Sequence, residues 1–134
     1  MKVDGSCHCG AITYTAEVDP AAVSLCHCND CQITAGSAFS FNVRTVDGKV
    51  NFTTGLPTIY IKKTAASGRH RAHAFCPVCA TRIYSGSVEP APPQITLRAG
   101  ALRQRRELKP KRQVWCSAAL DWATVDGPEC VAEQ

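Results

Sequence analysis

The sequence Cys26-His27-Cys28-Asn29-Asp30-Cys31 holds three thiols within six residues. Two further clusters flank it along the chain, Cys7-His8-Cys9 and Cys76-Pro77-Val78-Cys79. Thiolates spaced two or three residues apart can point at one ion, and tetrahedral zinc takes such sulfurs as ligands. The seven clustered cysteines fill one four-sulfur site and leave three. A zinc ion with three protein ligands keeps an open position for chemistry.

The length and composition indicate one folded domain. The chain has 134 residues, of which 45% are hydrophobic and 19% charged, as is typical of a globular protein. No linker or repeat divides it, so we expect a single zinc domain over residues 1–127. Residues 128–134, including Cys130, are predicted to form a flexible tail.

Nine cysteines in a short chain raise the question of disulfides. However, the count is odd, the chain opens without an apolar leader, and C-x-C pairs would make strained disulfides. We therefore expect reduced thiolates on metal, in a cytoplasmic protein. No run of about 18 apolar residues occurs, so no membrane-spanning helix and no membrane partner are predicted.

Basic residues are concentrated in two blocks, although the net charge is only +4. Residues 48–88 include six Lys and Arg and no acid, and residues 98–112 include seven against the single acid Glu107. The simplest interpretation of these blocks is an ordinary solvent-exposed surface. The functional alternative is a surface that attracts a small anionic substrate or binds nucleic acid weakly. Because aromatic residues are not interleaved with the basic ones, nucleic acid is not an expected partner.

The hydrophobic pattern predicts a mainly β protein. Apolar residues alternate with polar ones, which is the period of a half-buried strand, over 12–17, 39–44, 50–52, 72–76 and 95–97. The apolar residues at 59–61 and 83–84 are also interpreted as strands. Asp47-Gly48 is a turn signal that favours a hairpin into the strand at 50–52. The best helical signal is a short turn over 29–34, which ends at Ala35-Gly36.

The spacing of the cysteines suggests how they divide between two ions. Cys76 and Cys79 form a knuckle that needs two more ligands, and Cys7 and Cys9 make a sufficient complement. Such a site closes a loop of about seventy residues, and a structural zinc can offset the entropic cost. Cys26, Cys28 and Cys31 are too close along the chain to be shared easily, so we assign them to one ion. His8 and His27, as middle residues, are expected to point away.

The second ion could take a fourth ligand from Cys116, His70, His73 or Asp30. We interpret Cys116 as a small buried residue, and the two histidines as surface residues or neighbours of the ligands. Three other interpretations stay open. All seven clustered cysteines could hold structural zinc, the triad could be a redox centre without metal, or one site could hold an iron–sulfur cluster.

The motifs resemble those of the glutathione-dependent formaldehyde-activating enzyme family, which includes the centromere protein V-like domains. The resemblance rests on Gly5-Ser6-Cys7-His8-Cys9-Gly10, on Cys26 to Cys31 followed by Gly36, and on Phe75-Cys76-Pro77-Val78-Cys79. It continues through Arg98-Ala99-Gly100-Ala101-Leu102 and Trp115-Cys116-Ser117-Ala118. One departure is visible, because the family usually has glycine where this chain has Ala80. A glycine there can take a positive φ, which alanine adopts less easily.

The resemblance implies an Mss4-like β-tent fold and two Zn²⁺ ions per chain. A structural zinc would be held by Cys7, Cys9, Cys76 and Cys79, and a catalytic zinc by Cys26, Cys28 and Cys31. The implied activity is that of a carbon–sulfur lyase, an S-(hydroxymethyl)glutathione synthase-like enzyme acting on thiol–aldehyde adducts. The implied partner is a small thiol such as glutathione.

A mechanism that uses these residues needs a base and groups that bind the substrate. Asp30 and His27 are the candidate bases nearest in sequence to the triad. Carboxylates of the substrate would meet Arg69, Arg71 or the group at residues 103–106, because arginine can bind a carboxylate with two hydrogen bonds. The alternatives are a zinc-stapled binding module for an anionic partner, without catalysis, and a thiol-redox or metal-handling protein.

Overall fold

The computed structural model describes residues 1–88 and 93–134, and strands dominate it. The only α-helix of the described residues is α1 (Asn29–Ala35), and two 3-10 turns are η1 (Ala99–Ala101) and η2 (Cys116–Ala118). Pro90 and Pro92, beside the predicted strand at 95–97, lie outside the described residues. The strands are β1 (Lys2–Ser6), β2 (Thr13–Cys26), β3 (Ser40–Thr45), β4 (Asn51–Thr54), β5 (Thr58–Lys62), β6 (Arg71–Phe75), β7 (Arg82–Ser87), β8 (Ile95–Arg98), β9 (Arg112–Val114) and β10 (Glu129–Cys130).

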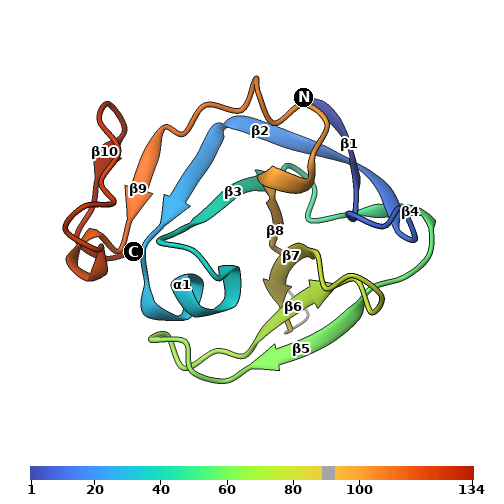
Figure 1. Cartoon of the computed structure of the whole chain (residues 1–134), viewed down its shortest axis with the longest axis horizontal. Coiled ribbons are helices and arrows are strands. Elements are labelled where there is room, and N and C mark those ends of the chain that lie inside the picture. The colour runs from blue at the N-terminus through green and yellow to red at the C-terminus, as the bar shows by residue number, and fades with distance from the viewer. Residues whose placement is uncertain (89–92) are drawn as a thin grey trace.

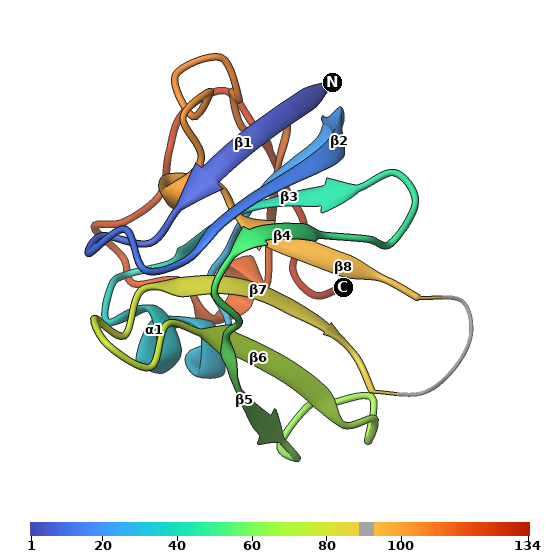
Figure 2. The ribbon, with the colours of Figure 1, turned by 90° about the vertical axis from the view of Figure 1, so that its right-hand side faces the viewer.

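The strands form an open sheet in the order β10-β9-β2-β3-β8-β7-β6-β5, and β1 and β4 pair with another part of β2. Figures 1 and 2 show the sheet curving, with α1 on its open side between the end of β2 and the β5–β6 hairpin. The prediction of a mainly β fold with cysteine clusters is confirmed. No helix among the described residues has the length and apolar character that a bilayer crossing requires.

The longest strand, β2, connects the two parts of the sheet. Its first part pairs with β1 and β4, and its last part pairs with β3 and β9. A register shift between Val18 and Val23 changes the inward positions from even to odd numbers, so that Tyr14 and Val18 are buried in one part and Val23 in the other. The hairpin expected at Asp47-Gly48 is not formed between β3 and β4, because β4 pairs with β2. Both strands instead use β2 as their partner.

The core lies on one side of this sheet. Tyr14 is its largest fully buried side chain, and it packs with β-branched and aliphatic residues of β2, β3, β7 and β8. Gly5 on β1 faces Tyr14 so closely that an added Cβ would lie 2.3 Å from the tyrosine ring. Only a residue without a side chain fits there. The core cluster includes Val3, Ile12, Tyr14, Val18, Val23, Val43, Ala74, Ile83, Leu97 and Leu102.

The chain end, for which a flexible tail is predicted, makes two connections to the rest of the structure. A disulfide joins Cys116 to Cys130, and β10 pairs in parallel with β9. The prediction that Cys116 is a small buried residue is therefore wrong, and in this disulfide its sulfur is not available as a metal ligand. The odd cysteine count argued against full pairing, but it left this one pair possible. The seven clustered cysteines are free thiols.

Candidate metal centres

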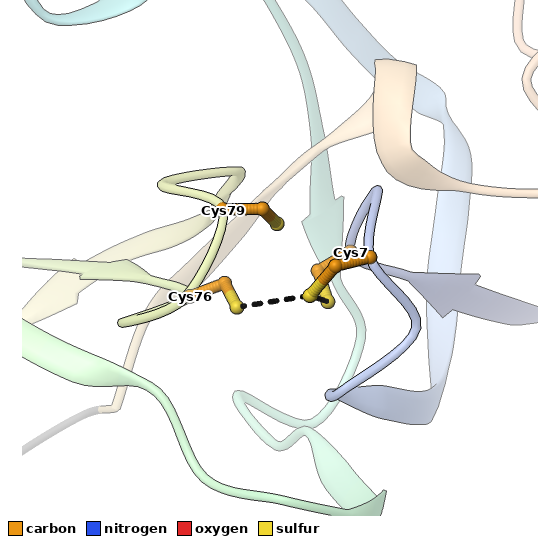
Figure 3. Close-up of side chains that lie close together, drawn as sticks. Cys7, Cys76 and Cys79 are labelled. Carbon is orange, nitrogen blue, oxygen red and sulfur yellow. Dashed lines mark hydrogen bonds between the residues drawn. The ribbon is translucent and has the colours of Figure 1, made fainter.

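Four sulfur atoms from distant parts of the chain meet at one point. Cys7 and Cys9 lie in the turn between β1 and β2, and Cys76 and Cys79 lie in the turn between β6 and β7. Their Sγ atoms all lie within 4.8 Å of one another. Figure 3 shows the side chains of Cys7, Cys76 and Cys79 pointing toward one another. We call Cys7, Cys9, Cys76 and Cys79 the four-sulfur cluster.

The spacing of these sulfurs fits a tetrahedral metal ion. Metal–sulfur bonds of about 2.3 Å in a tetrahedron place the sulfurs about 3.8 Å apart. The Sγ atoms of Cys7 and Cys9 are 3.6 Å apart, and those of Cys9 and Cys76 are 3.8 Å apart. With four sulfurs the tetrahedral shell is complete, so an ion bound here would have no open position.

Hydrogen-bond donors surround the four-sulfur cluster. The amide of Ile12 donates to Cys7 Sγ at 3.2 Å, and the amide of Val78 donates to Cys76 Sγ at 3.4 Å. The Thr81 hydroxyl lies 3.1 Å from Cys79 Sγ and lowers the pKa of that thiol to about 5. The knuckle closes at Ala80, whose φ of +60° is the left-handed conformation that a glycine takes more easily.

The remaining three clustered cysteines lie at the junction of β2 and α1. Cys26 ends β2, Cys28 is the N-cap of α1, and Cys31 lies in the first turn of the helix. Cys28 Sγ accepts a hydrogen bond from the Cys31 amide at 3.3 Å, and Gly36 ends the helix in the left-handed conformation. The three Sγ atoms lie within 4.8 Å of one another. We call Cys26, Cys28 and Cys31 the three-sulfur cluster.

The three-sulfur cluster also has the chemistry of a metal site. Hydrogen bonds from Cys26 and Cys28 lower the pKa of Cys31, and the Ser40 hydroxyl adds to the effect. Hydrogen bonds with Cys28 and Cys31, together with burial, raise the pKa of Cys26. In the absence of a cation the group thus favours a single thiolate, and a divalent ion is the partner that would let all three ionise.

The histidines between the cysteines are placed away from both clusters. His8 is exposed, and its backbone amide donates to the Thr81 hydroxyl at 3.0 Å. His27 is fully buried, and its Nε2 lies 3.0 Å from Gln113 Oε1 on β9. Among the described residues neither histidine belongs to a group that could hold a metal. His27 therefore ties the cysteine loop to β9.

Asp30, the other candidate base, is held in an ion pair. Its Oδ2 lies 2.7 Å from Lys62 Nζ and accepts a hydrogen bond from the Thr64 hydroxyl at 2.8 Å. The hydrogen bond from Lys62 lowers the pKa of the Asp30 carboxyl, with Thr64 assisting. A carboxylate with a lowered pKa is a weaker base, and this one joins α1 to the β5–β6 hairpin.

The three-sulfur cluster opens on a cavity of about 1010 Å³. One wall is a polar face of the sheet, opposite the core. Residues paired in register run across it as Arg44 on β3, Thr96 on β8, Ser85 on β7 and His73 on β6. Side chains two residues along a strand share its face, which adds Asn42, Arg98 and Arg71. All seven residues line the cavity, and we call them the polar face: Asn42, Arg44, Arg71, His73, Ser85, Thr96 and Arg98.

A chain of hydrogen bonds connects the polar face to the three-sulfur cluster. Arg98 donates to Asn42 Oδ1, and Asn42 Nδ2 donates to Ser40 Oγ at 2.8 Å. Ser40 in turn forms a hydrogen bond with Cys31. Positive charge and fixed donors thus approach the sulfurs from the β3–β8 side.

His73 is a buried, neutral side chain in the cavity wall. Burial, followed by the charges of Arg98, Arg82 and Lys62, lowers the pKa of His73 to about 4. Arg82 donates to its Nδ1, which assigns the remaining proton to Nε2. The expectation that His73 is a surface residue or a neighbour of the ligands is half right: it lies beside the cluster but is only 4% exposed. His70 is exposed.

Of the arginines expected to bind a substrate, only some line the cavity of the three-sulfur cluster. Arg71 lines the cavity of the three-sulfur cluster, whereas Arg103 and Arg105 line another cavity, of about 730 Å³, with Thr81. The sequence reasoning missed Arg44 and Arg98. The alternating patterns at 39–44 and 95–97 contained the signal, because they place both arginines on the polar side of their strands.

The fold and the two clusters define a small β protein with two cysteine groups that could each hold a metal ion. The chain matches the family described as "Glutathione-dependent formaldehyde-activating enzyme" over residues 2–118, and it belongs to that family. Its fold is similar to that of a Rhodobacter sphaeroides protein solved by structural genomics, with a TM-score of 0.57 and 19% identity over 75% of this chain and 87% of that one. No curated protein matches the sequence.

Proposed function

We propose that this protein is a zinc-dependent carbon–sulfur lyase that forms or cleaves thiol–aldehyde adducts such as S-hydroxymethylglutathione. The observation that carries the proposal is the contrast in coordination. The four-sulfur cluster is complete, whereas the three-sulfur cluster has one ligand fewer and opens on a cavity of about 1010 Å³. The family to which the chain belongs supports the same chemistry.

Two zinc ions per chain fit the two clusters. Cys7, Cys9, Cys76 and Cys79 would hold a structural ion, and Cys26, Cys28 and Cys31 would hold a catalytic one. When bound at the three-sulfur cluster, zinc supplies a site that favours the thiolate form of an incoming thiol. The cytoplasmic location and the Mss4-like assignment stay predictions.

The side chains around the cavity account for the remaining steps. In the forming direction the thiolate sulfur attacks the carbonyl carbon, and the carbonyl π electrons move to oxygen. His73, neutral and with its proton on Nε2, can donate a hydrogen bond to that oxygen, and a proton from water completes the hydroxyl. In reverse, the hydroxyl proton leaves, the carbonyl re-forms and the C–S electrons return to sulfur. Asp30 and His27 remain candidate bases, although each already has a partner.

The test is the rate of exchange between free formaldehyde and its glutathione adduct. We expect zinc-loaded wild-type protein to accelerate this exchange, measured by NMR magnetisation transfer, and Cys28→Ser to abolish the acceleration. The double variant Cys116→Ser/Cys130→Ser, which replaces two cysteines that lie outside the clusters, is the matched control and keeps the activity. An unaccelerated exchange with wild type, or equal acceleration by Cys28→Ser, contradicts the proposal.

A binding module for an anionic partner is the second candidate. It is favoured by Arg103 and Arg105, which line the other cavity, and by the exposed Arg106 beside them. Binding of a polyanion such as heparin that weakens steeply with salt would support it. Absence of binding at about 50 mM salt would exclude it.

A further inference from the structure

Three guanidinium groups converge on the wall of the cavity that faces the three-sulfur cluster. On the polar face, Arg98 on β8 is opposite Asn42, and Arg44 lies two residues further along β3. Diagonal neighbours of this kind are about 7–8 Å apart at the backbone, within reach of two long side chains. Arg71 on β6 lines the same cavity as Arg44 and Arg98. Burial lowers the pKa of Arg71, and the nearby charges of Arg44 and Arg98 lower it further.

These three charges are not balanced within the part of the chain that the structure describes. The ion pairs of the described residues join Lys62 to Asp30, Arg103 to Asp4 and Arg112 to Glu129, and none includes Arg44, Arg71 or Arg98. Arg71 and Arg98 are partly buried, and burial lowers the pKa of both. Holding Arg71 and Arg98 together partly away from water is costly unless an anion joins them, and the exposed Arg44 adds a third positive charge beside them.

The charge of the cluster itself does not cancel this excess. Three thiolates with one divalent ion would carry a net charge of −1, and three guanidinium groups carry +3, so these groups together carry about two positive charges. Asp19 and Glu133 also line the cavity, but among the described residues neither forms an ion pair with these arginines. His73 adds none near neutral pH, because its pKa is lowered to about 4 by burial and nearby cations. A ligand with a single carboxylate would leave one of these charges uncompensated.

We propose that Arg44, Arg71 and Arg98 form a subsite for a compact group that carries two negative charges, so that the substrate is a thiol adduct that also carries a phosphate or paired carboxylates. The inference rests on the proposed function for the thiol end of the ligand, but the anion subsite can be tested without it. Glutathione has two carboxylates far apart and an ammonium group, and it matches this arrangement less well than a thiol with a compact dianion.

The first test measures anion binding to the metal-loaded protein by titration calorimetry at pH 8. Inorganic phosphate, malonate and acetate are the probes, and the variants are Arg44→Gln and Arg71→Gln. Arg106→Gln is the matched control, because it removes the same charge from an exposed residue outside the cavity. We expect phosphate or malonate to bind at least about tenfold more tightly than acetate, and to lose about tenfold in each cavity variant but less than twofold in the control.

The two dianions distinguish the source of the charge. Tighter binding of phosphate assigns a phosphorylated substrate, and tighter binding of malonate assigns a dicarboxylate. The proposal is overturned if both dianions bind no better than acetate, or if Arg106→Gln weakens them as much as Arg71→Gln does.

A second measurement separates this inference from the proposed function. Formaldehyde adducts of mercaptosuccinate, which has two neighbouring carboxylates, and of thioglycolate, which has one, are compared as substrates. We expect the ratio of their kcat/KM values to favour mercaptosuccinate and to fall in Arg71→Gln. Turnover of both adducts with no preference overturns the subsite alone. Dianion binding lost in the cavity variants, together with no turnover of any adduct, supports the subsite and overturns the lyase.

Discussion

The four-sulfur and three-sulfur clusters offer the same ligand atom in two contrasting settings. The first joins turns 67 residues apart in sequence, between Cys9 and Cys76, and its sulfurs are surrounded by amides and the Thr81 hydroxyl. The second comes from six consecutive residues and faces a cavity with arginines on its wall. An ion held by ligands from distant segments would hold the fold together, whereas an ion held by ligands from one loop would leave the fold independent of it. We therefore expect a structural and a reactive site to differ in the separation of their ligands along the chain and in whether a cavity adjoins them.

Removing one ligand from each cluster should have the largest and most unequal effect. Cys76→Ser is expected to unfold the protein, because structural zinc contributes on the order of 10 kcal/mol, comparable to the whole stability of a domain. Cys28→Ser should lose one metal ion and keep the fold. Circular dichroism and elemental analysis of both variants check this. If Cys28→Ser unfolds as completely as Cys76→Ser, the two clusters are both structural.

Chelation should separate the two ions without a mutation. We expect two zinc ions per chain and loss of the first under mild chelator with little change in the far-UV spectrum, since three ligands release an ion more easily than four. Release of the second should coincide with unfolding. Metal content and ellipticity followed in one titration measure this. Simultaneous loss of both ions would contradict the difference between the clusters.

The buried histidine on the three-sulfur side should make stability depend on pH. The pKa of His73 is lowered from 6.5 to about 4 on folding, so between these values the unfolded chain binds the extra proton and stability falls as the pH falls. The contribution is present above about pH 6.5 and amounts to roughly 3 kcal/mol when fully lost. Its causes are burial, then Arg98, Arg82 and Lys62.

Comparing variants isolates this effect from the release of metal by acid. Denaturant unfolding of metal-loaded wild type, His73→Gln and the exposed control His70→Gln at pH 7 and pH 5 should give a smaller acid loss for His73→Gln alone. Equal losses in all three proteins would mean that His73 titrates alike in the folded and unfolded chains.

The smallest expected effect lies on the four-sulfur side. Ala80 has a φ of +60°, and replacing it with glycine should stabilise the protein by about 1 kcal/mol, because the strain relieved exceeds the added entropy of the unfolded chain. Ala66→Gly, in an exposed loop without positive φ, is the control and should be neutral or destabilising. Thermal unfolding of both variants measures the difference. A loss of stability in Ala80→Gly would show that the knuckle is unstrained.

Local patterns predicted much of this structure because they arise from neighbouring residues. The strands near 39–44, 59–61, 72–76 and 95–97 and the helix ending at Gly36 all form, and the cysteine spacings group the sulfurs as the structure does. Local patterns did not predict the pairing of β4 with β2 or the disulfide between Cys116 and Cys130. Both depend on which distant segments meet, and neither leaves a periodic signal in the sequence.

The candidate site shows the same limit. The sulfur ligands carry a spacing signal, but the arginines that face them come from three strands, and only the registers of β3, β8, β7 and β6 bring them together. His73 looked like a surface residue because its neighbours His70 and Arg71 are polar. Its burial follows from the cavity wall and not from its own segment.

Strand β2 begins just after the Cys7–Cys9 turn and ends at Cys26, so a single strand sets the spacing between the two clusters. In an extended strand, one added residue turns every later side chain to the opposite side, and Cys26 would then point away from Cys28 and Cys31. The exposed stretch at residues 19–21, where the register already shifts, is the place where a change of length could be absorbed. Insertions and deletions among natural relatives should therefore gather there and be rare elsewhere in the strand.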